Sequence, residues 1–199
     1  MTEAQTDYAA ALKDAFGIST RSENLLPLLV DAAIVIVGGV CTLGVLAGPL
    51  AVGYNAMAVR ASRGQPIAVG DSLKGLSQLG TALVAGLLVF LAAVVLGCTV
   101  VGAPAVAFFA SWVFVILAER PGTSAVDAIK ASVQLALAHP VDTAVLAVVC
   151  WGLGSIASPT FLGSVAVYAF SAVLTAILYQ RFTAQGAPAG LPANAPATF

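Results

Sequence analysis

Residues 75–118 read GLSQLGTALVAGLLVFLAAVVLGCTVVGAPAVAFFASWVFVILA and contain no charged side chain over 44 positions. Two further stretches share this property, residues 32–59 and residues 143–180, with 28 and 38 positions. A helix that crosses a hydrocarbon core of roughly 30 Å needs about 20 apolar residues. Each stretch is therefore too long for a single crossing, and we expect each to fold back on itself as a helical hairpin inside a membrane.

The composition of the whole chain agrees with a membrane location. Of its 199 residues, 60 % are hydrophobic and only 9 % are charged, against roughly 25 % charged in a soluble domain. The net charge is −1, and the basic residues form neither a run nor an aromatic–basic stripe, which argues against nucleic acid as a partner. Membrane lipids, and a membrane-protein partner, are the partners that this composition favours.

A long internal period divides the chain into three units. Pro49, Pro104 and Pro159 are spaced by 55 residues, and each lies inside one of the charge-free stretches. Between the stretches, the segment 71–79 matches the segment 127–135, 56 residues later, in its Asp, Lys, Gln and Leu positions. The agreement in phase predicts three repeats. Their approximate bounds are 9–63, 66–120 and 122–182.

Each repeat is expected to contain a short amphipathic helix, a spanning helix, a bend and a returning helix. Proline suits the first turn of the returning helix, where its missing N–H has no intrahelical partner. The predicted fold is all-α, a polytopic membrane protein with about six transmembrane helices arranged as three hairpins. The predicted spans are residues 26–44, 46–62, 80–99, 102–119, 141–157 and 160–181.

Segments outside the spans have simpler interpretations. Residues 1–23 are predicted to be a cytoplasmic amphipathic segment, and the transmembrane domain covers residues 24–182. The connectors 66–79 and 124–137 are predicted to be amphipathic helices at the membrane interface, the second opened by Ser124 and Asp127 as a capping box. Residues 183–199 are rich in Ala, Pro and Gly and are predicted to be disordered.

All eight basic residues lie outside the charge-free stretches, on the side that holds both termini and the connectors. The three bends contain none. The positive-inside rule therefore predicts that both termini face the cytoplasm and that the bends face outward, in a bacterial inner membrane. Four of these cations are candidates for contacts with the membrane interface, where long basic side chains reach lipid phosphates. They are Arg60, Arg63, Lys74 and Lys130.

Few side chains are suited to chemistry inside the membrane. Asp31 and Asp142 lie near the start of the outgoing helices of repeats one and three, and His139 shares a helix face with Asp142. Together they are candidates for a polar relay that carries a proton or a cation. The competing interpretation places both aspartates near helix N-termini, where the helix dipole favours an anion. Pro140 supports it.

Small residues and cysteines point to packing rather than to a reaction. Gly44 and Gly48 form a Gly-x-x-x-Gly pair, which we interpret as a close contact within one chain and not as evidence for a homo-oligomer. The three cysteines stand at unequal distances before the bend prolines, without a nearby His or acidic residue. We therefore expect no metal site and no cofactor. No catalytic motif is present, so enzymatic activity is not predicted.

Four short runs carry a resemblance to a known family: AGPLAVGY at 47–54, MAVR at 57–60, RGQP at 63–66 and DSLKGL at 71–76. They resemble uncharacterised bacterial multi-pass membrane proteins that are similar to the membrane domain of glycerophosphoryl diester phosphodiesterases. AIKAS at 128–132 and the segment 159–168 resemble the second half of such proteins, so the resemblance covers most of residues 25–182. It implies a six-helix integral membrane domain without an established activity of its own.

Two functions follow as expectations. The first is an inner-membrane protein without enzymatic activity that acts as a scaffold or regulatory component of the membrane. The alternative is a small permease or channel-like transporter, in which Asp31, His139 and Asp142 would line a path. These two hypotheses differ in whether the polar side chains inside the membrane are free to carry a solute or are used in holding helices together.

Overall fold

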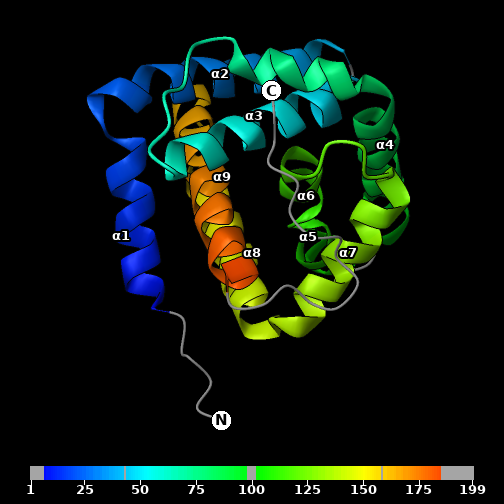
Figure 1. Ribbon diagram of the computed structural model, residues 1–199. Coiled ribbons are helices and arrows are strands. Elements are labelled where there is room, and N and C mark those ends of the chain that lie inside the picture. The colour runs from blue at the N-terminus through cyan, green and yellow to red at the C-terminus, as the bar shows by residue number, and fades with distance from the viewer. Residues whose placement is uncertain (1–6, 43, 98–101, 158, 185–199) are drawn as a thin grey trace.

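The computed structural model describes residues 7–42, 44–97, 102–157 and 159–184, and every regular element in them is a helix (Figure 1). The predicted all-α fold is confirmed at this level. Most of the predicted disordered tail, from residue 185 onward, lies outside the described residues. The elements are α1 (Tyr8–Ser19), α2 (Ser22–Cys41), α3 (Ala47–Ser62), the 3₁₀ helix η1 (Asp71–Gln78), α4 (Leu79–Gly97), α5 (Gly102–Ala110), α6 (Val113–Glu119), α7 (Ala125–Ala138), α8 (Pro140–Ala157) and α9 (Phe161–Ala184).

Four helical segments in the described residues are long and apolar enough to cross a membrane: α2, η1 with α4, α8 and α9. Six had been predicted. The other two predicted spans are also helical, but α3 has only 16 residues, and the segment 102–119 is divided into α5 and α6. At 1.5 Å per residue α3 is about 24 Å long, which is less than the thickness of a hydrocarbon core.

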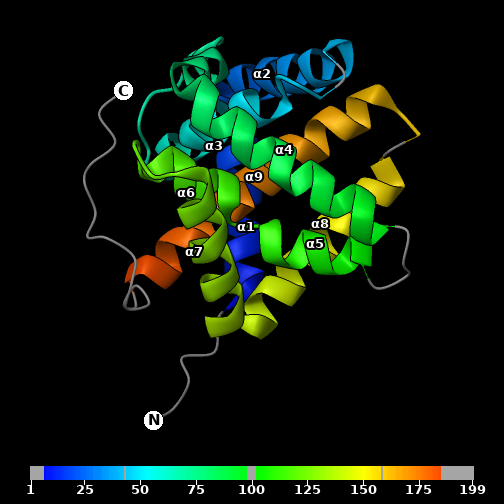
Figure 2. The ribbon, with the colours of Figure 1, turned by 90° about the vertical axis from the view of Figure 1, so that its right-hand side faces the viewer.

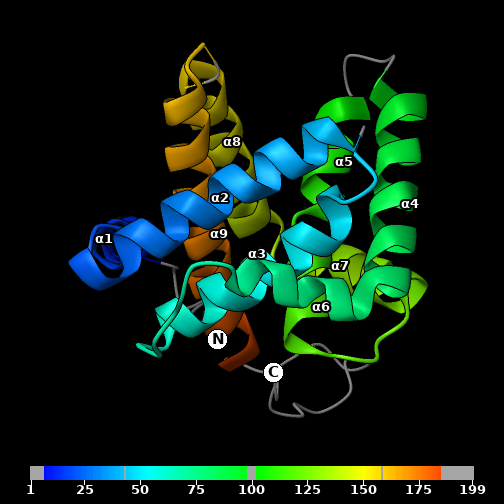
Figure 3. The ribbon, with the colours of Figure 1, turned by 90° about the horizontal axis from the view of Figure 1, so that it is seen from above.

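The helices form an inner and an outer group. The inner group consists of α3, α6 and α9, which contact one another, while α2, α4 and α8 pack on it from outside. The packed pairs α2–α3, α4–α5 and α8–α9 have their junctions at the upper side of Figure 3, and the opposite side holds α1 and the C-terminal end of α9. Figure 2 shows the same separation from the side, with the junctions toward the right. The two ends of the bundle are therefore structurally different.

Glycines allow α3 to touch η1 and α4 through the backbone. A Cβ atom placed on Gly53 would lie 1.9 Å from the carbonyl oxygen of Ser72, and one placed on Gly75 would lie 2.2 Å from the carbonyl oxygen of Pro49. Gly48 approaches the backbone of Ala82 in the same way, at 2.4 Å. Only residues without a Cβ atom permit such separations, which explains why α3 is the most enclosed helix of the bundle.

The predicted close contact at the Gly-x-x-x-Gly pair is half right. Gly48 makes it, but Gly44 has a φ of +86° and forms the turn between α2 and α3. In that turn the Thr42 hydroxyl donates to the Gly38 carbonyl at 2.6 Å and accepts the N–H of Leu46 at 3.1 Å. The turn needs the left-handed backbone conformation that glycine adopts without strain.

The outer helices expose apolar side chains that a water-soluble fold would bury. Only 11 % of the apolar window is buried in the η1–α4 segment and in α8, against 50 % in α9. A continuous apolar surface of this kind marks contact with lipid or with another protein. The exposed side chains include Leu87, Phe90, Leu91, Val94, Val95, Val148, Trp151 and Ile156.

The break between α5 and α6 is held by neighbouring helices. The hydroxyl of Ser132 in α7 donates to the carbonyl oxygen of Phe109 at 2.6 Å and accepts the N–H of Trp112 at 3.2 Å. The buried indole of Trp112 donates to the Thr143 hydroxyl in α8, also at 3.2 Å. These bonds satisfy backbone groups that the interrupted helix leaves free, which is the condition for a broken helix inside a membrane protein.

Two local predictions need correction and one is confirmed. The connector 66–79 is not one amphipathic helix, because only η1 is helical and Gly53 holds it against α3. Pro159 precedes α9 instead of lying in its first turn, because the Thr160 hydroxyl accepts the N–H of Gly163 at 3.2 Å and begins the helix. The second connector forms α7, and Ser124 caps it as predicted by accepting the N–H of Asp127 at 3.2 Å.

Candidate functional site

Polar side chains gather at the end of the bundle that is opposite the three junctions. The first group centres on Asp31 of α2, which has no exposed surface. One carboxylate oxygen accepts the N–H of Gly70 at 2.7 Å, and the other accepts the N–H of Ser72 at 3.0 Å. Hydrogen bonds to an ionised acceptor are stronger than neutral ones, and the start of a helix favours an anion. Asp31 therefore anchors α2 to the start of η1.

Asp71 lies between those two amides, and its carboxylate binds cations. It forms ion pairs with Arg60 of α3 and with Lys74, the latter at 2.8 Å, and it accepts the N–H of Ala68 at 3.0 Å. Two of the four cations that were predicted to contact the interface are therefore engaged within the protein. Sequence analysis did not identify Asp71 as a partner, although its spacing to Lys74 is the i,i+3 spacing of helical ion pairs.

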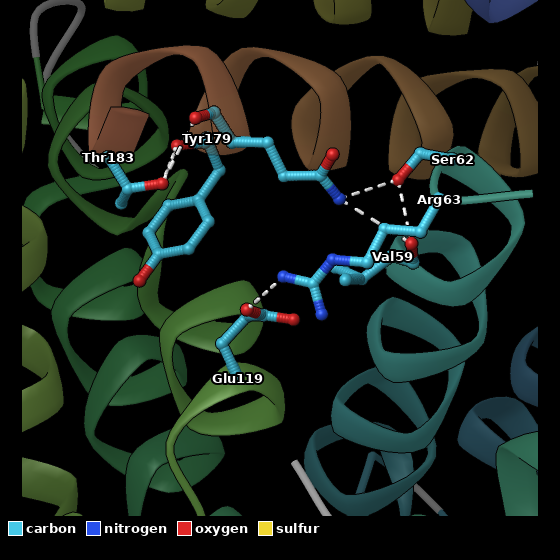
Figure 4. Close-up of polar contacts among 7 residues, drawn as sticks. Val59, Ser62, Arg63, Glu119, Tyr179 and Thr183 are labelled. Atoms are coloured by element: carbon cyan, nitrogen blue, oxygen red, sulfur yellow. Dashed lines mark hydrogen bonds and ion pairs between the residues drawn. The ribbon is translucent and has the colours of Figure 1, made fainter. Parts of the chain in front are cut away.

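The C-terminal ends of α3, α6 and α9 are linked by a second polar group (Figure 4). Arg63, which follows α3, pairs with Glu119 at the end of α6 at 2.6 Å. On the opposite side of α3, the amide nitrogen of Gln180 in α9 donates to the Ser62 hydroxyl at 2.7 Å. Arg63 is thus a third predicted interfacial cation that has a protein partner. These bonds join one residue from the returning helix of each repeat.

Arg120 and Tyr179 extend this group into the interior. Only 7 % of the Arg120 surface is exposed, and its Nε and Nη1 atoms have no hydrogen-bond partner among the described residues. The Tyr179 hydroxyl interacts electrostatically with Arg120 and Glu119. An arginine closes each returning helix, at Arg63, Arg120 and Arg181, where a cation complements the helix dipole. This recurrence is a sequence signal for the group that sequence analysis missed.

His139 and Asp142 form a third group with residues from both ends of the chain. The Nδ1 atom of His139 lies 3.6 Å from one oxygen of Asp142, whose other oxygen accepts the hydroxyl proton of Tyr8 at 2.7 Å. The imidazole stacks on the ring of Phe182, with 4.3 Å between ring centroids. Burial, together with the bond to Asp142, raises the pKa of Tyr8 to about 12. The group joins α1, α8 and α9.

The described residues divide the predicted polar relay into two separate groups. Asp31 is bonded to the start of η1, whereas His139 and Asp142 are bonded to each other and to Tyr8. No hydrogen bond or ion pair in the described part of the chain joins Asp31 to either of the others. Asp142 lies in the first turn of α8, where the helix dipole favours an anion.

Comparison of the chain with protein-family models, with curated proteins and with solved structures gave no match. The resemblance to the membrane domain of glycerophosphoryl diester phosphodiesterases therefore stays a prediction. The geometry of the three polar groups is the basis for a functional conclusion.

Proposed function

We propose that this protein is an integral, multi-pass membrane protein whose six helices cross the bilayer as three hairpins, with both termini and the cation-rich end on the cytoplasmic side of an inner membrane. Four segments have the length and the apolar character for crossing, which supports the proposal. The short helix α3 lies inside the bundle, where other helices cover it and no contact with the full bilayer thickness is needed. The eight cations support the orientation.

Within the membrane, the proposed role is that of a scaffold or regulatory component without enzymatic activity. One observation carries this proposal: the acidic groups at the cytoplasmic end bind other helices. Asp31 holds η1, Asp71 holds Arg60 of α3, and Asp142 holds Tyr8 of α1. Ionisable groups inside a transporter line a water-filled path, whereas these stabilise contacts between elements.

The permease hypothesis predicts a different behaviour for the same residues. A path through Asp31, His139 and Asp142 requires their side chains to exchange protons or bind a cation in sequence. The full burial of Asp31 and the separation of the two groups favour the structural role. The two hypotheses differ in a quantity that can be measured directly.

Proton flux into proteoliposomes separates the scaffold from the permease. We expect the wild-type chain and the double variant Asp31→Asn/Asp142→Asn to show the flux of protein-free liposomes. The double variant should also unfold at lower temperature, because it loses charged hydrogen bonds worth about 1.5–3 kcal/mol each. A wild-type flux above the protein-free rate that disappears in the double variant would establish the permease instead.

A further inference from the structure

The repeats place two equivalent helix junctions side by side for comparison. In the first, α3 packs on η1, and in the second, α5 and α6 pack on α7. Gly53 and Gly75 form the first junction, and the residues 56 positions later are Phe109 and Ala131. The Gly53–Gly75 contact brings the backbones together and leaves a hollow of only about 10 Å³.

The second junction is open where the first is closed. A groove of about 230 Å³ lies between α4, α5, α6 and α7, and apolar side chains line it. Leu88 and Leu96 of α4 and Phe109 of α5 line this groove and are also exposed, at 38 %, 45 % and 37 %. The larger side chain at Phe109 prevents the backbone contact seen at Gly53, so a space remains that opens toward the apolar surface.

A cation without a protein partner lies next to this groove. In the first junction, Lys74 pairs with Asp71 at 2.8 Å. In the second, the equivalent Asp127 accepts the Ser124 hydroxyl at 2.7 Å, and no carboxylate of the described residues pairs with the exposed Lys130. Lys130 follows the groove residue Ile129 and stands one helical turn before the groove residue Val133.

We propose that this groove, in the membrane-inserted protein proposed above, holds one acyl chain of an anionic phospholipid, and that Lys130 binds the phosphate of the same molecule. The apolar lining matches an acyl chain, and the unpaired ammonium matches a negative headgroup. A lysine stem lies along apolar surface while its charge reaches the headgroup level. The site distinguishes lipids because a cation near the membrane surface contributes about 1 kcal/mol toward an anionic lipid, roughly a fivefold preference.

Native mass spectrometry of the full chain, released from vesicles of equal parts phosphatidylglycerol and phosphatidylcholine, measures this preference. We expect phosphatidylglycerol to be retained in about fivefold excess by the wild type and by Lys130→Arg. Lys130→Gln should retain both lipids equally. Lys13→Gln is the matched control, because Lys13 is also exposed but lies in α1, which packs against α9. It should keep the wild-type preference.

A second variant tests the groove itself. Ala92→Trp fills the space from α4 and should lower the amount of both bound lipids. An unchanged lipid ratio in Lys130→Gln, or unchanged lipid retention in Ala92→Trp, would overturn the proposed site. Extraction of the vesicles with alkaline carbonate separates this result from a failure of the membrane proposal. A wild-type chain that resists extraction but shows no lipid preference contradicts only the lipid site, whereas an extracted chain contradicts both.

Discussion

The helices α3 and α4 are neighbours in the chain and in space, yet their surroundings are opposite. From Gly48 to Tyr54 every residue of α3 is buried, whereas α4 exposes large apolar side chains such as Phe90 and Val95, at 60 % and 70 %. The difference lies in residue size, because α3 carries the glycines that allow backbone contact. Apolar character identifies a helix that belongs in a membrane, and small residues identify the helix at the centre of the bundle.

The largest effect is expected at the glycine contact. Gly53→Ala places a Cβ atom 1.9 Å from the Ser72 carbonyl, so α3 and η1 must separate. We expect a loss of about 3 kcal/mol or more in the free energy of unfolding, measured by denaturation in detergent. Gly80→Ala in α4 is the control, because no atom lies within 4 Å of the added Cβ. Equal stability of the two variants would disprove the close contact.

A matched pair of leucines compares the burial of the two helices. Leu50 of α3 is 2 % exposed and Leu91 of α4 is 48 % exposed. Leu50→Ala should cost about 3 kcal/mol through the cavity that it leaves, and Leu91→Ala should cost less than about 1 kcal/mol. Thermal unfolding of both variants in the same detergent gives the comparison. A larger loss at Leu91 would mean that α4 packs inside the bundle.

Asp31 tests how η1 is kept against α3. Asp31→Asn removes the charge and leaves one of the two backbone N–H groups, of Gly70 or Ser72, without its acceptor. The expected loss is about 2 kcal/mol, because the bonds to the ionised group are replaced by at most one neutral bond. Hydrogen exchange should become faster in η1 and stay unchanged in α8. Unchanged exchange in η1 would show that Asp31 does not hold this element.

The smallest effect is expected at the edge of the bundle, where α1 joins α8. Tyr8→Phe removes the bond to Asp142 and should cost about 1 kcal/mol. Because the pKa of Tyr8 is raised to about 12 in the folded protein, this contribution is present below the ordinary tyrosine value near 10 and is lost as the pH rises through about 12. Ultraviolet titration of the wild type against Tyr8→Phe measures this pKa. A Tyr8 pKa near 10 would contradict the bond.

Helix positions could be predicted from the sequence, and tertiary partners could not. Charge-free stretches and the spacing of Pro49 and Pro104 locate the helices within a few residues. The burial of α3 depends on Gly53 and Gly75, which lie 22 residues apart and meet only in the folded chain. The break before Trp112 depends in the same way on Ser132 of α7. Periodicity describes a single helix, whereas these features arise from pairs of helices.

The candidate site shows the same division. Asp31 and Asp142 could be recognised as unusual residues because they lie near the charge-free stretches, but their roles depend on atoms from other elements. Asp31 binds backbone amides of η1, which no sequence pattern of α2 reveals. Asp142 binds Tyr8, which is 134 residues away.

Labelling of single cysteines with a membrane-impermeant maleimide tests most directly the central claim, that the chain crosses a bilayer with its cations on one side. In a chain whose native cysteines are replaced by alanine, Val45→Cys and Thr160→Cys mark the junction end, and Lys74→Cys and Lys130→Cys mark the cation end. We predict that intact cells label the first pair and that the second pair reacts only after the membrane is opened. Labelling of Lys74→Cys or Lys130→Cys from outside intact cells would contradict the account.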